Sequence, residues 1–409
     1  MLSRLLPLHW LRRPWKPLVF ANANFTRIPE TQKIEEERFP DYVAARYYPT
    51  RIGEVLQDRY QVVGKLGFGS TSTVWLARDM HRRRYVTLKI SIQTTSMGTA
   101  MEEELKVYKR ISNTATAHPG RSAVRSLLDA FEIRGPGDQH QCLVHEPLYE
   151  NVTAFLGRNP VGRLPKVMLA YTLHRIFTAL DYLHTECQII HTDVKADNIM
   201  FESSDQSVLV DVEQGELQAP SPRKELEGRC IYTSRELKFS KYMGLPVLCD
   251  FGTTVKGGVE HLEEAQPNIY RAPEVLLQVP WTYSIDIWNV GCMIWDIFEG
   301  GFLFTGKDPE LNRYTKQAHL AEIISLLGPP PPEFLARGQL SHKFFTDGEF
   351  SAPGTVNTVT LEQRETSLSG EDKADFLRFM RRMLQWEPEK RSSAKSLAQD
   401  DWIIKQIKQ

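Results

Sequence analysis

The sequence predicts an α+β fold with two lobes, in which a small antiparallel lobe precedes a larger and mainly helical lobe. Short strand-like segments follow one another at residues 60–63, 74–77 and 86–90, a pattern typical of antiparallel strands. Runs with apolar residues at helical spacing predict helices at residues 167–184, 283–298, 316–327 and 373–386. At 409 residues, the sequence is long enough for two lobes that each have a core.

The composition is that of an ordinary globular protein. Hydrophobic residues make up 41% and charged residues 25% of the sequence, which argues against general disorder. The net charge of -1 gives no reason to expect direct binding of nucleic acid, and no run of about 18 apolar residues suggests a membrane span. Five scattered cysteines without a C-x-x-C pair favour reduced thiols over a disulfide framework or a zinc site. We expect a monomer.

The N-terminal extension, residues 1–45, is basic at its start. Arginines and a lysine, interleaved with Leu and Trp, precede the first acid, Glu30. This composition resembles a mitochondrial transit peptide, although Pro7, Pro14 and Pro17 weaken the amphipathic helix that import needs. A disordered basic tail is the alternative. The expected location is the cytoplasm and nucleus, or the mitochondrion if the segment is a transit peptide. In both cases we expect this segment to lie outside the fold.

A segment containing glycine connects the first two predicted strands, Tyr60–Val63 and Val74–Ala77. Glycine lets the backbone approach phosphate groups, whose oxygens can accept hydrogen bonds from backbone N–H groups. A simple hairpin turn would have the same sequence features, and a dinucleotide-binding motif should open a helix rather than a second strand. The candidate phosphate-binding residues are Leu66, Gly67, Phe68, Gly69, Ser70, Thr71, Ser72, Thr73 and Val74.

The third predicted strand, Val86–Ile90, carries Lys89 in the pattern Val-Thr-Leu-Lys. This pattern is typical of a strand whose lysine holds the α and β phosphates of ATP. A helix is predicted next, because the apolar positions of residues 101–108 share one face. It contains consecutive glutamates from Glu102 to Glu104.

The stretch 191–198, HTDVKADN, follows a helical run and a short apolar strand. It places the carboxylate of Asp193, the cation of Lys195 and the amide of Asn198 on one short loop. In phosphotransferases this spacing supplies a group that orients the proton of a hydroxyl, a charge that neutralises the transferred phosphate and a ligand for magnesium. A polar loop without chemistry is the alternative for this stretch alone.

Two aspartates are candidates for the metal ligand that would act together with Asn198. Asp211 lies about a dozen residues beyond Asn198, the usual separation, but Val and Glu follow it. Asp250 begins the tripeptide Asp-Phe-Gly after an apolar strand, and its glycine permits the turn. We choose Asp250, which makes about residues 203–245 an insertion, expected on the surface and without a catalytic role.

Two later motifs are Arg271-Ala272-Pro273-Glu274 and Ser284-Ile285-Asp286-Ile287-Trp288. Together with the motifs above, they make residues 60–403 resemble a eukaryotic protein kinase. Within that family the sequence most resembles the serine/arginine-rich protein kinases, and among them the fungal branch. This closer resemblance is carried by His191 to Asp193, Leu66 to Ala77, Tyr270 to Leu276 and Asp286 to Cys292.

The resemblance implies a two-lobed protein kinase fold, with a small lobe over residues 60–147, a large lobe over residues 148–403 and MgATP in the cleft. It implies that Asp193 orients the substrate hydroxyl and that lysines neutralise phosphate charge, whereas an amide and a carboxylate hold Mg²⁺. The residues with these roles are Asp193, Lys195, Lys89, Asn198 and Asp250.

Further roles are implied for residues around the site. Glu104 would pair with Lys89, and backbone groups of Glu146 and Leu148 would bond the edge of the adenine. Structural roles are implied for Glu274, which would pair with Arg391, and for Asp286, which would brace the catalytic loop.

The sequence departs from the family pattern at several positions. Thr192 replaces the usual Arg, which would pair with a phosphate on the activation segment and so order that segment. Without this Arg, phosphorylation has no partner here, and we expect a kinase that is active as made. Pro267 replaces a Thr that helps to position the substrate hydroxyl. Gln317 and Ser325 replace acids of the groove that docks Arg-Ser tracts, which puts docking in doubt.

The predicted function is transfer of the γ-phosphate of ATP to serine or threonine hydroxyls, with Arg/Ser-rich proteins such as splicing factors as substrates. Lys195 favours Ser/Thr over Tyr specificity. A related kinase that prefers acidic or Pro-directed sites is one alternative. The other is a pseudokinase scaffold that binds partners through the insertion and the basic tail.

Overall fold

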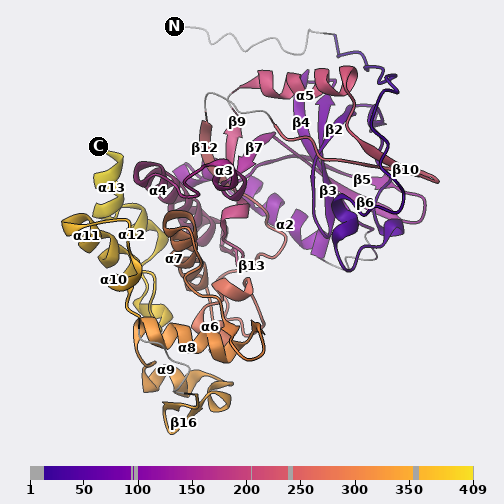
Figure 1. Ribbon diagram of the computed structural model, residues 1–409. Helices are drawn as coiled ribbons and strands as arrows, with labels where there is room; N and C mark the ends of the chain where they lie inside the picture. The colour runs from indigo at the N-terminus through magenta and orange to yellow at the C-terminus, as the bar shows by residue number, and fades with distance from the viewer. Residues whose placement is uncertain are drawn as a thin grey trace, which may run out of the picture. The chain divides into compact units, whose positions relative to one another are not determined.

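The computed structural model describes residues 13–93, 95, 100–203, 205–237, 243–352 and 359–408. The protein divides into two compact units. Unit 1 consists of Met1–Ser112, Ser126–Tyr149 and Glu202–Gly244, and unit 2 consists of Asn113–Arg125, Glu150–Phe201 and Leu245–Gln409. A sheet dominates unit 1 and helices dominate unit 2 (Figure 1), so the predicted α+β fold class is confirmed.

Unit 1 is built on a six-stranded sheet with the strand order β1-β2-β3-β4-β6-β5. All neighbouring strands are antiparallel. Because successive side chains point to opposite faces, residues such as Val62, Trp75 and Leu88 fill a core on one face. The strands are β1 (Val55–Leu56), β2 (Tyr60–Phe68), β3 (Ser72–Asp79), β4 (Arg84–Ser91), β5 (Leu127–Arg134) and β6 (Gln139–His145).

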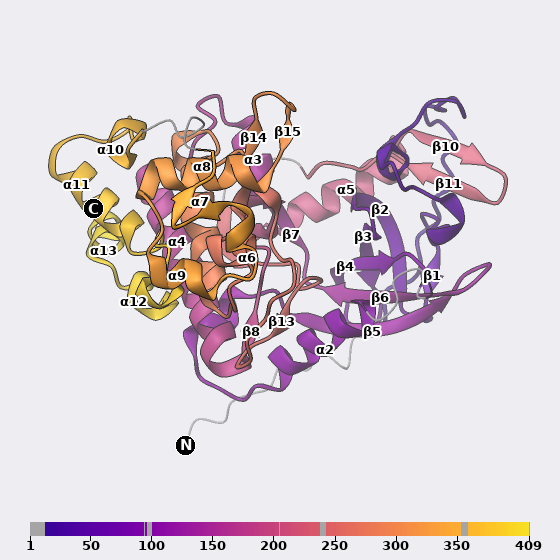
Figure 2. The same ribbon diagram turned by 90° about the horizontal axis from the view of Figure 1, so that it is seen from below.

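The predicted insertion is a structured part of unit 1, not a surface excursion. Asp205 is the N-cap of its helix α5 (Gln206–Gln218), and the Asp205 side chain accepts a hydrogen bond from the N–H of Ser207. Leu209 and Val212 of α5 pack against the face of the sheet that carries Val63, Leu76 and Tyr85. Figure 2 shows α5 beside β2, followed by the hairpin of β10 (Arg223–Leu226) and β11 (Arg229–Tyr232). The insertion therefore covers the second face of the sheet.

The described part of the N-terminal extension, residues 13–45, also belongs to unit 1, so our expectation that it lies outside the fold was wrong. The side-chain amide of Gln61 pairs with both the N–H and the C=O of Leu18, each at 2.8 Å. The N–H of Ile28 donates to the C=O of Arg223 at 2.9 Å, which brings the extension beside β10 (Figure 2). Residues 1–12 lie outside the described residues, so the transit peptide and the cellular location stay predictions.

Residues 113–125 belong to unit 2, although the sequence placed them in the small lobe. His118 stacks on Tyr182 and its Nε2 lies 3.1 Å from the carboxylate of Asp181. The N–H of Arg125 donates to the C=O of Leu248 at 2.9 Å. These contacts join the segment to α4 (Lys166–Tyr182) and β12 (Met243–Leu248).

The core of unit 2 is formed around the helices α4 and α7 (Ser284–Glu299). Nearly all residues of α7 are buried, as in a helix that is surrounded by protein. The predicted helix Lys316–Leu327 is found with those bounds as α8. The other helices are α3 (Val152–Arg158), α6 (Pro273–Leu277), α9 (Pro332–Arg337), α10 (Leu361–Arg364), α11 (Gly370–Arg381), α12 (Ala394–Ala398) and α13 (Asp401–Ile407).

The remaining elements are α2 of unit 1, strands that lead from one unit to the other, and short strand pairs of unit 2. Helix α2 spans Ala100–Asn113. The backbone passes between the units within β7 (Leu148–Asn151), β9 (Ile199–Ser203) and β12, and on either side of residues 113–125. The short strands are β8 (Ile189–Ile190), β13 (Val255–Lys256), β14 (Lys307–Asp308), β15 (Arg313–Tyr314), β16 (Phe345–Thr346) and β17 (Glu349–Phe350).

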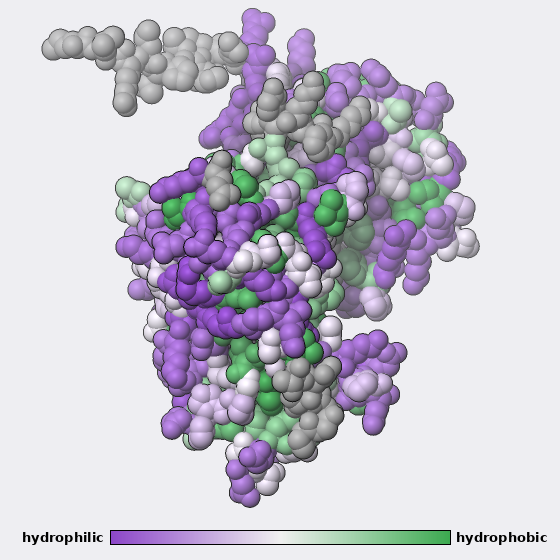
Figure 3. Space-filling view, turned by 60° about the vertical axis from the view of Figure 1, so that its left-hand side comes forward, coloured by the Kyte–Doolittle hydropathy of each residue, from purple (hydrophilic) through white to green (hydrophobic). Residues whose placement is uncertain are grey.

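Hydrophilic residues cover most of the face drawn in Figure 3, with smaller hydrophobic areas between them. In the described ranges no helix is long and apolar enough to cross a membrane.

Candidate active site

In unit 1 the glycine-bearing segment is the tip of the β2–β3 hairpin. Gly67 pairs with Val74 and Phe68 with Thr73, and the N–H of Gly69 donates to the C=O of Ser72 at 2.7 Å to close the turn. A Cβ atom on Gly67 would meet no other atom within 4 Å, so open space adjoins the backbone there. This geometry suits a phosphate that comes close to backbone N–H groups.

Lys89 and Glu104 form an ion pair in unit 1. Lys89 Nζ lies 2.8 Å from Glu104 Oε1, and the Glu104 side chain is 3% exposed. The neighbouring Glu103 is exposed and pairs with Lys106 on the same helix, at 2.7 Å. Of the glutamates Glu103 and Glu104, therefore, Glu104 faces the strand that carries Lys89.

The predicted adenine-binding residues lie at the end of β6 and the start of β7. Glu146 follows β6, and its carboxylate pairs with Arg84 Nη1 at 2.6 Å. Leu148 begins β7 and is buried. The side chain of Glu146 is thus engaged by Arg84, and only its backbone groups are left to form hydrogen bonds with adenine.

In unit 2 the catalytic loop brings the predicted carboxylate, cation and amide together. Lys195 Nζ lies 3.0 and 2.8 Å from the carboxylate oxygens of Asp193. Asn198 Nδ2 donates to Asp193 twice, to the backbone carbonyl oxygen and to Oδ2, each at 2.8 Å. The Asp193 carboxylate is therefore fixed in direction by two side chains from its own loop.

Asp286 braces this loop from α7, as the resemblance implied. Its carboxylate is fully buried and accepts hydrogen bonds from the N–H of His191 at 2.8 Å and of Thr192 at 2.7 Å. His184 Nε2 lies 2.8 Å from the same carboxylate. Thr192 has a φ of +67°, which is strained for a β-branched residue, and the bonds to Asp286 hold it there.

Asp250 lies two residues after the end of β12, and its neighbours join it to the catalytic loop. The C=O of Cys249 lies 3.1 Å from His191 Nε2, and the N–H of Asp193 lies 3.3 Å from His191 Nδ1, so one neutral tautomer of His191 satisfies both. The buried Phe251 ring lies 5.4 Å from that of His191. Asp211, the rejected candidate, lies in the middle of α5 in unit 1.

Glu274 and Arg391 form a bidentate ion pair with both side chains fully buried. Their nitrogen–oxygen distances are 2.6 and 2.7 Å. Arg391 also donates to the C=O groups of Ser284 and Gln385 at 2.9 to 3.0 Å. This satisfied pair ties α6 to the segment before α12 and has a structural role.

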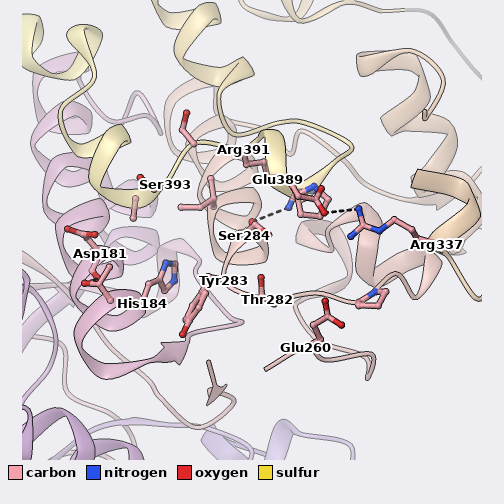
Figure 4. Close-up of a pocket in the computed structure, with 16 residues that line it drawn as sticks. Asp181, His184, Glu260, Thr282, Tyr283, Ser284, Arg337, Glu389, Arg391 and Ser393 are labelled. Atoms are coloured by element: carbon pink, nitrogen blue, oxygen red, sulfur yellow. Dashed lines mark hydrogen bonds and ion pairs between the residues drawn. The ribbon is translucent and has the colours of Figure 1, made fainter. Parts of the chain in front are cut away.

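A cavity of about 450 Å³ lies beside this pair in unit 2 (Figure 4). His184 and Tyr283 line it on one side, and Arg337, which pairs with Glu389 at 2.7 Å, lines it on the other. None of the catalytic-loop residues 191–198 lines this cavity, so it is separate from the predicted chemistry.

Two contacts at the site were missed by the sequence analysis. The hydroxyl of Thr192 donates to the C=O of Thr253 at 2.9 Å, which joins the catalytic loop to the residue after Asp-Phe-Gly. His184 supports Asp286, as described above. A single threonine or histidine carries no motif, so local sequence gives no signal for either contact.

Comparisons with known proteins decide the family. The family model described as Protein kinase domain matches residues 60–403. The protein belongs to the protein kinase family. A serine/threonine protein kinase of Aspergillus fumigatus is 41% identical to this kinase over 98% of its length and 100% of the relative. Both findings confirm the resemblance drawn from the motifs.

More distant relatives narrow the family further. The serine/threonine-protein kinase SRPK of Physarum polycephalum is 31% identical over 88% of this kinase and 89% of the relative. SRSF protein kinase 3 of Sus scrofa is 25% identical over 90% of both proteins. A crystal structure of a kinase domain matches the fold with a TM-score of 0.67 and 21% identity, covering 88% of this kinase and 99% of that domain.

The protein is thus a serine/threonine protein kinase of the SRPK-like group, and ATP is the phosphate donor that this family implies. The comparisons give no support to the pseudokinase scaffold.

Proposed function

We propose that this kinase transfers the γ-phosphate of MgATP to serine or threonine hydroxyls of Arg/Ser-rich proteins. The observation that carries the chemistry is the catalytic loop, where Asp193 is held by Lys195 and Asn198 and the backbone is held by Asp286. Positioning and charge neutralisation are the main tasks of a phosphotransfer site.

Asp193 would orient the substrate hydroxyl and accept its proton. The hydroxyl oxygen then forms a bond to the γ-phosphorus, and the bond from that phosphorus to the oxygen of ADP breaks. Lys195, which lies 2.8 Å from Asp193, would neutralise charge on the transferred phosphoryl group. Lys89, fixed by Glu104, would neutralise the α and β phosphates.

The donor atoms of Asn198 and Asp250 fit magnesium. Asn198 uses its Nδ2 on Asp193, which leaves the amide oxygen as the atom able to bind a cation. Asp250 contributes a carboxylate, and Mg²⁺ prefers such oxygen ligands. When bound, Mg²⁺ would neutralise charge on the phosphates.

Two findings support Arg/Ser-rich substrates. Relatives are named SRPK and SRSF protein kinase 3, and a cavity of about 770 Å³ along α8 is lined by the acids Asp308, Glu310 and Glu322. Carboxylates around a cavity favour a cationic segment such as an arginine-rich tract.

The same cavity also explains why docking should be moderate. Gln317 and Ser325 line it in place of acids, and Lys307 and Arg364 add positive charge. Glu322 is occupied by the N–H groups of Thr305 and Gly306, at 2.6 and 2.9 Å. Glu310 is exposed, and its charge is the easiest to remove without disturbing the fold.

A peptide comparison tests this substrate class. The kinase should phosphorylate an Arg-Ser repeat peptide with a kcat/KM about tenfold or more above peptides with acidic or Pro-directed sites, equivalent to about 1.4 kcal/mol. Glu310→Gln should raise KM for the Arg-Ser peptide about two- to fivefold and leave kcat unchanged, as expected for a single rim charge. Equal kcat/KM values for all peptides would contradict the proposal.

A further inference from the structure

Residues Ile34–Tyr47, which we call the N-terminal clasp, contact the β2–β3 hairpin at successive points up to its tip. Glu36 forms a buried ion pair with Lys65 on β2. The Phe39 ring packs edge-on against Phe68, with 5.9 Å between ring centroids. At the tip, the Tyr47 hydroxyl lies 2.8 Å from the carbonyl oxygen of Ser70 and 3.3 Å from that of Gly69.

The contact of Tyr47 fixes the direction of the backbone at the tip. A trans peptide unit is planar, so its C=O and its N–H point in opposite directions. Because the carbonyls of Gly69 and Ser70 point toward Tyr47, the N–H groups of Ser70 and Thr71 point away from it. Both residues are exposed, and among the described residues no acceptor is found for these N–H groups.

The clasp itself is held by two other parts of unit 1. The C=O of Arg46 accepts a hydrogen bond from the N–H of Gln93, after β4, at 2.8 Å. The C=O of Tyr47 accepts one from Arg229 of β11 at 3.0 Å. Burial raises the pKa of Tyr47 to about 12, so its hydroxyl remains a donor at neutral pH. The insertion therefore supports the hairpin tip through Tyr47.

We propose that the N-terminal clasp is a positioning element of the glycine-rich loop, which holds the N–H groups of Ser70 and Thr71 toward the phosphates of ATP through the hydroxyl of Tyr47. This inference rests on the proposed use of ATP. The clasp pre-forms the loop before the nucleotide binds, so part of the ordering cost of binding is removed.

The test compares Tyr47→Phe with Tyr48→Phe in the full-length protein. Tyr48 is a matched control, because its hydroxyl bonds to Glu54 and not to the loop. Binding is measured by titration with a trinitrophenyl derivative of ATP and Mg²⁺, and loop opening by hydrogen exchange of residues 66–74. Loss of one hydrogen bond should weaken binding, and speed exchange of these amides, by about three- to tenfold. Tyr48→Phe should stay within about twofold of wild type on both readouts.

The outcomes separate this inference from the proposed function. If Tyr47→Phe binds the probe and exchanges like wild type, or if both variants weaken binding equally, the clasp does not position the loop. If wild type binds the probe but phosphorylates no peptide, the proposed function fails, whereas weaker binding and faster exchange in Tyr47→Phe would still support the clasp. Should Tyr47→Phe not fold, Arg229→Gln replaces it in the test, because Arg229 donates to the C=O of Tyr47. Arg229→Gln should also weaken binding of the probe and speed exchange of residues 66–74, and wild-type values would contradict the inference.

Discussion

At the scale of single residues, Thr192 explains how the catalytic loop can be ordered without a phosphate. The usual Arg at this position would need a phosphorylated partner, whereas Thr192 donates its hydroxyl hydrogen bond to the C=O of Thr253 at 2.9 Å. This hydrogen bond tethers the catalytic loop to the residue after Asp-Phe-Gly without a phosphate. Thr192 makes this hydrogen bond with a backbone φ of +67°, and the hydrogen bond from its N–H to Asp286 holds the backbone in that conformation.

Thr192→Val tests this tether, because valine keeps the shape and removes the hydroxyl. We expect kcat to fall about three- to tenfold, the effect of one net hydrogen bond, with KM for ATP little changed. Thr192→Ser should restore most of the rate. Phosphatase treatment of the wild-type protein should leave its rate unchanged, and a large loss of rate on such treatment would argue against a kinase that is active as made.

A second residue-scale prediction concerns Asp296, a half-buried residue of α7 that accepts a hydrogen bond from Tyr270. Burial raises the pKa of Asp296 to about 7, from an ordinary value of about 3.9. The folded protein therefore retains a proton that the unfolded protein loses. This contribution to stability is complete below about pH 4, declines as the pH rises above that value and is lost once the pH passes about 7.

Asp296→Asn is neutral at every pH and can still accept from Tyr270. The unfolding temperature of this variant relative to wild type should increase between about pH 5 and pH 8, since each pKa unit corresponds to about 1.4 kcal/mol. Thermal unfolding at a series of pH values measures this difference. A difference that is constant with pH would show that Asp296 is ionised throughout.

At the scale of elements, the insertion acts as the cover of the sheet. Leu209 of α5 is 1% exposed and packs with Val63, Leu76 and Tyr85, whereas the adjacent Val210 is 40% exposed. The two positions therefore differ in burial on the same helix.

Leu209→Ala should destabilise unit 1 by about 2–4 kcal/mol, because it leaves a cavity against the sheet. Val210→Ala is the matched control and should change stability by less than about 0.5 kcal/mol. Chemical denaturation followed by tryptophan fluorescence compares the two. Equal effects would mean that α5 does not cover the sheet through Leu209.

Elements with strong local patterns could be predicted from the sequence. The helices α7 and α8 have sustained helical periodicity, and they were predicted to within one residue at each end. The strands β3 and β4 were predicted to within two residues at each end, whereas β2 extends five residues beyond the predicted strand. The helix α5 was missed although Val208, Leu209 and Val212 have helical spacing, because the charged residues around them suggested an exposed loop. This helix packs against the second face of the sheet, whose residues lie far from α5 in the sequence, so a short stretch of sequence does not reveal the contact.

The N-terminal extension shows the same limit more clearly. Residues 13–45 have little regular structure, and they are held by single side chains from distant positions. Gln61 binds Leu18, and Lys224 binds Glu37 at 2.7 Å. Such pairings leave no periodicity in the sequence, so the extension, with its basic start, could be interpreted only as a tail or a targeting signal.

At the scale of the whole molecule, the predicted site residues divide between the two units. Lys89, Glu104 and the glycine-rich loop belong to unit 1, whereas Asp193, Asn198 and Asp250 belong to unit 2. Motif spacing predicted both groups, because each lies on short segments whose sequence pattern is local. The supports of these groups, such as the clasp and Thr253, come from elsewhere in each unit and required the structure.

The most direct test of the account is phosphotransfer by the purified full-length protein, without any activating kinase, on an Arg-Ser repeat peptide with MgATP. Wild type should be active, Asp193→Ala and Asp250→Ala should lose at least about a hundredfold in kcat, and Asp211→Ala should retain wild-type activity. Loss of activity in Asp211→Ala with retention in Asp250→Ala would contradict the metal assignment. An unchanged rate in Asp193→Ala would contradict the central claim.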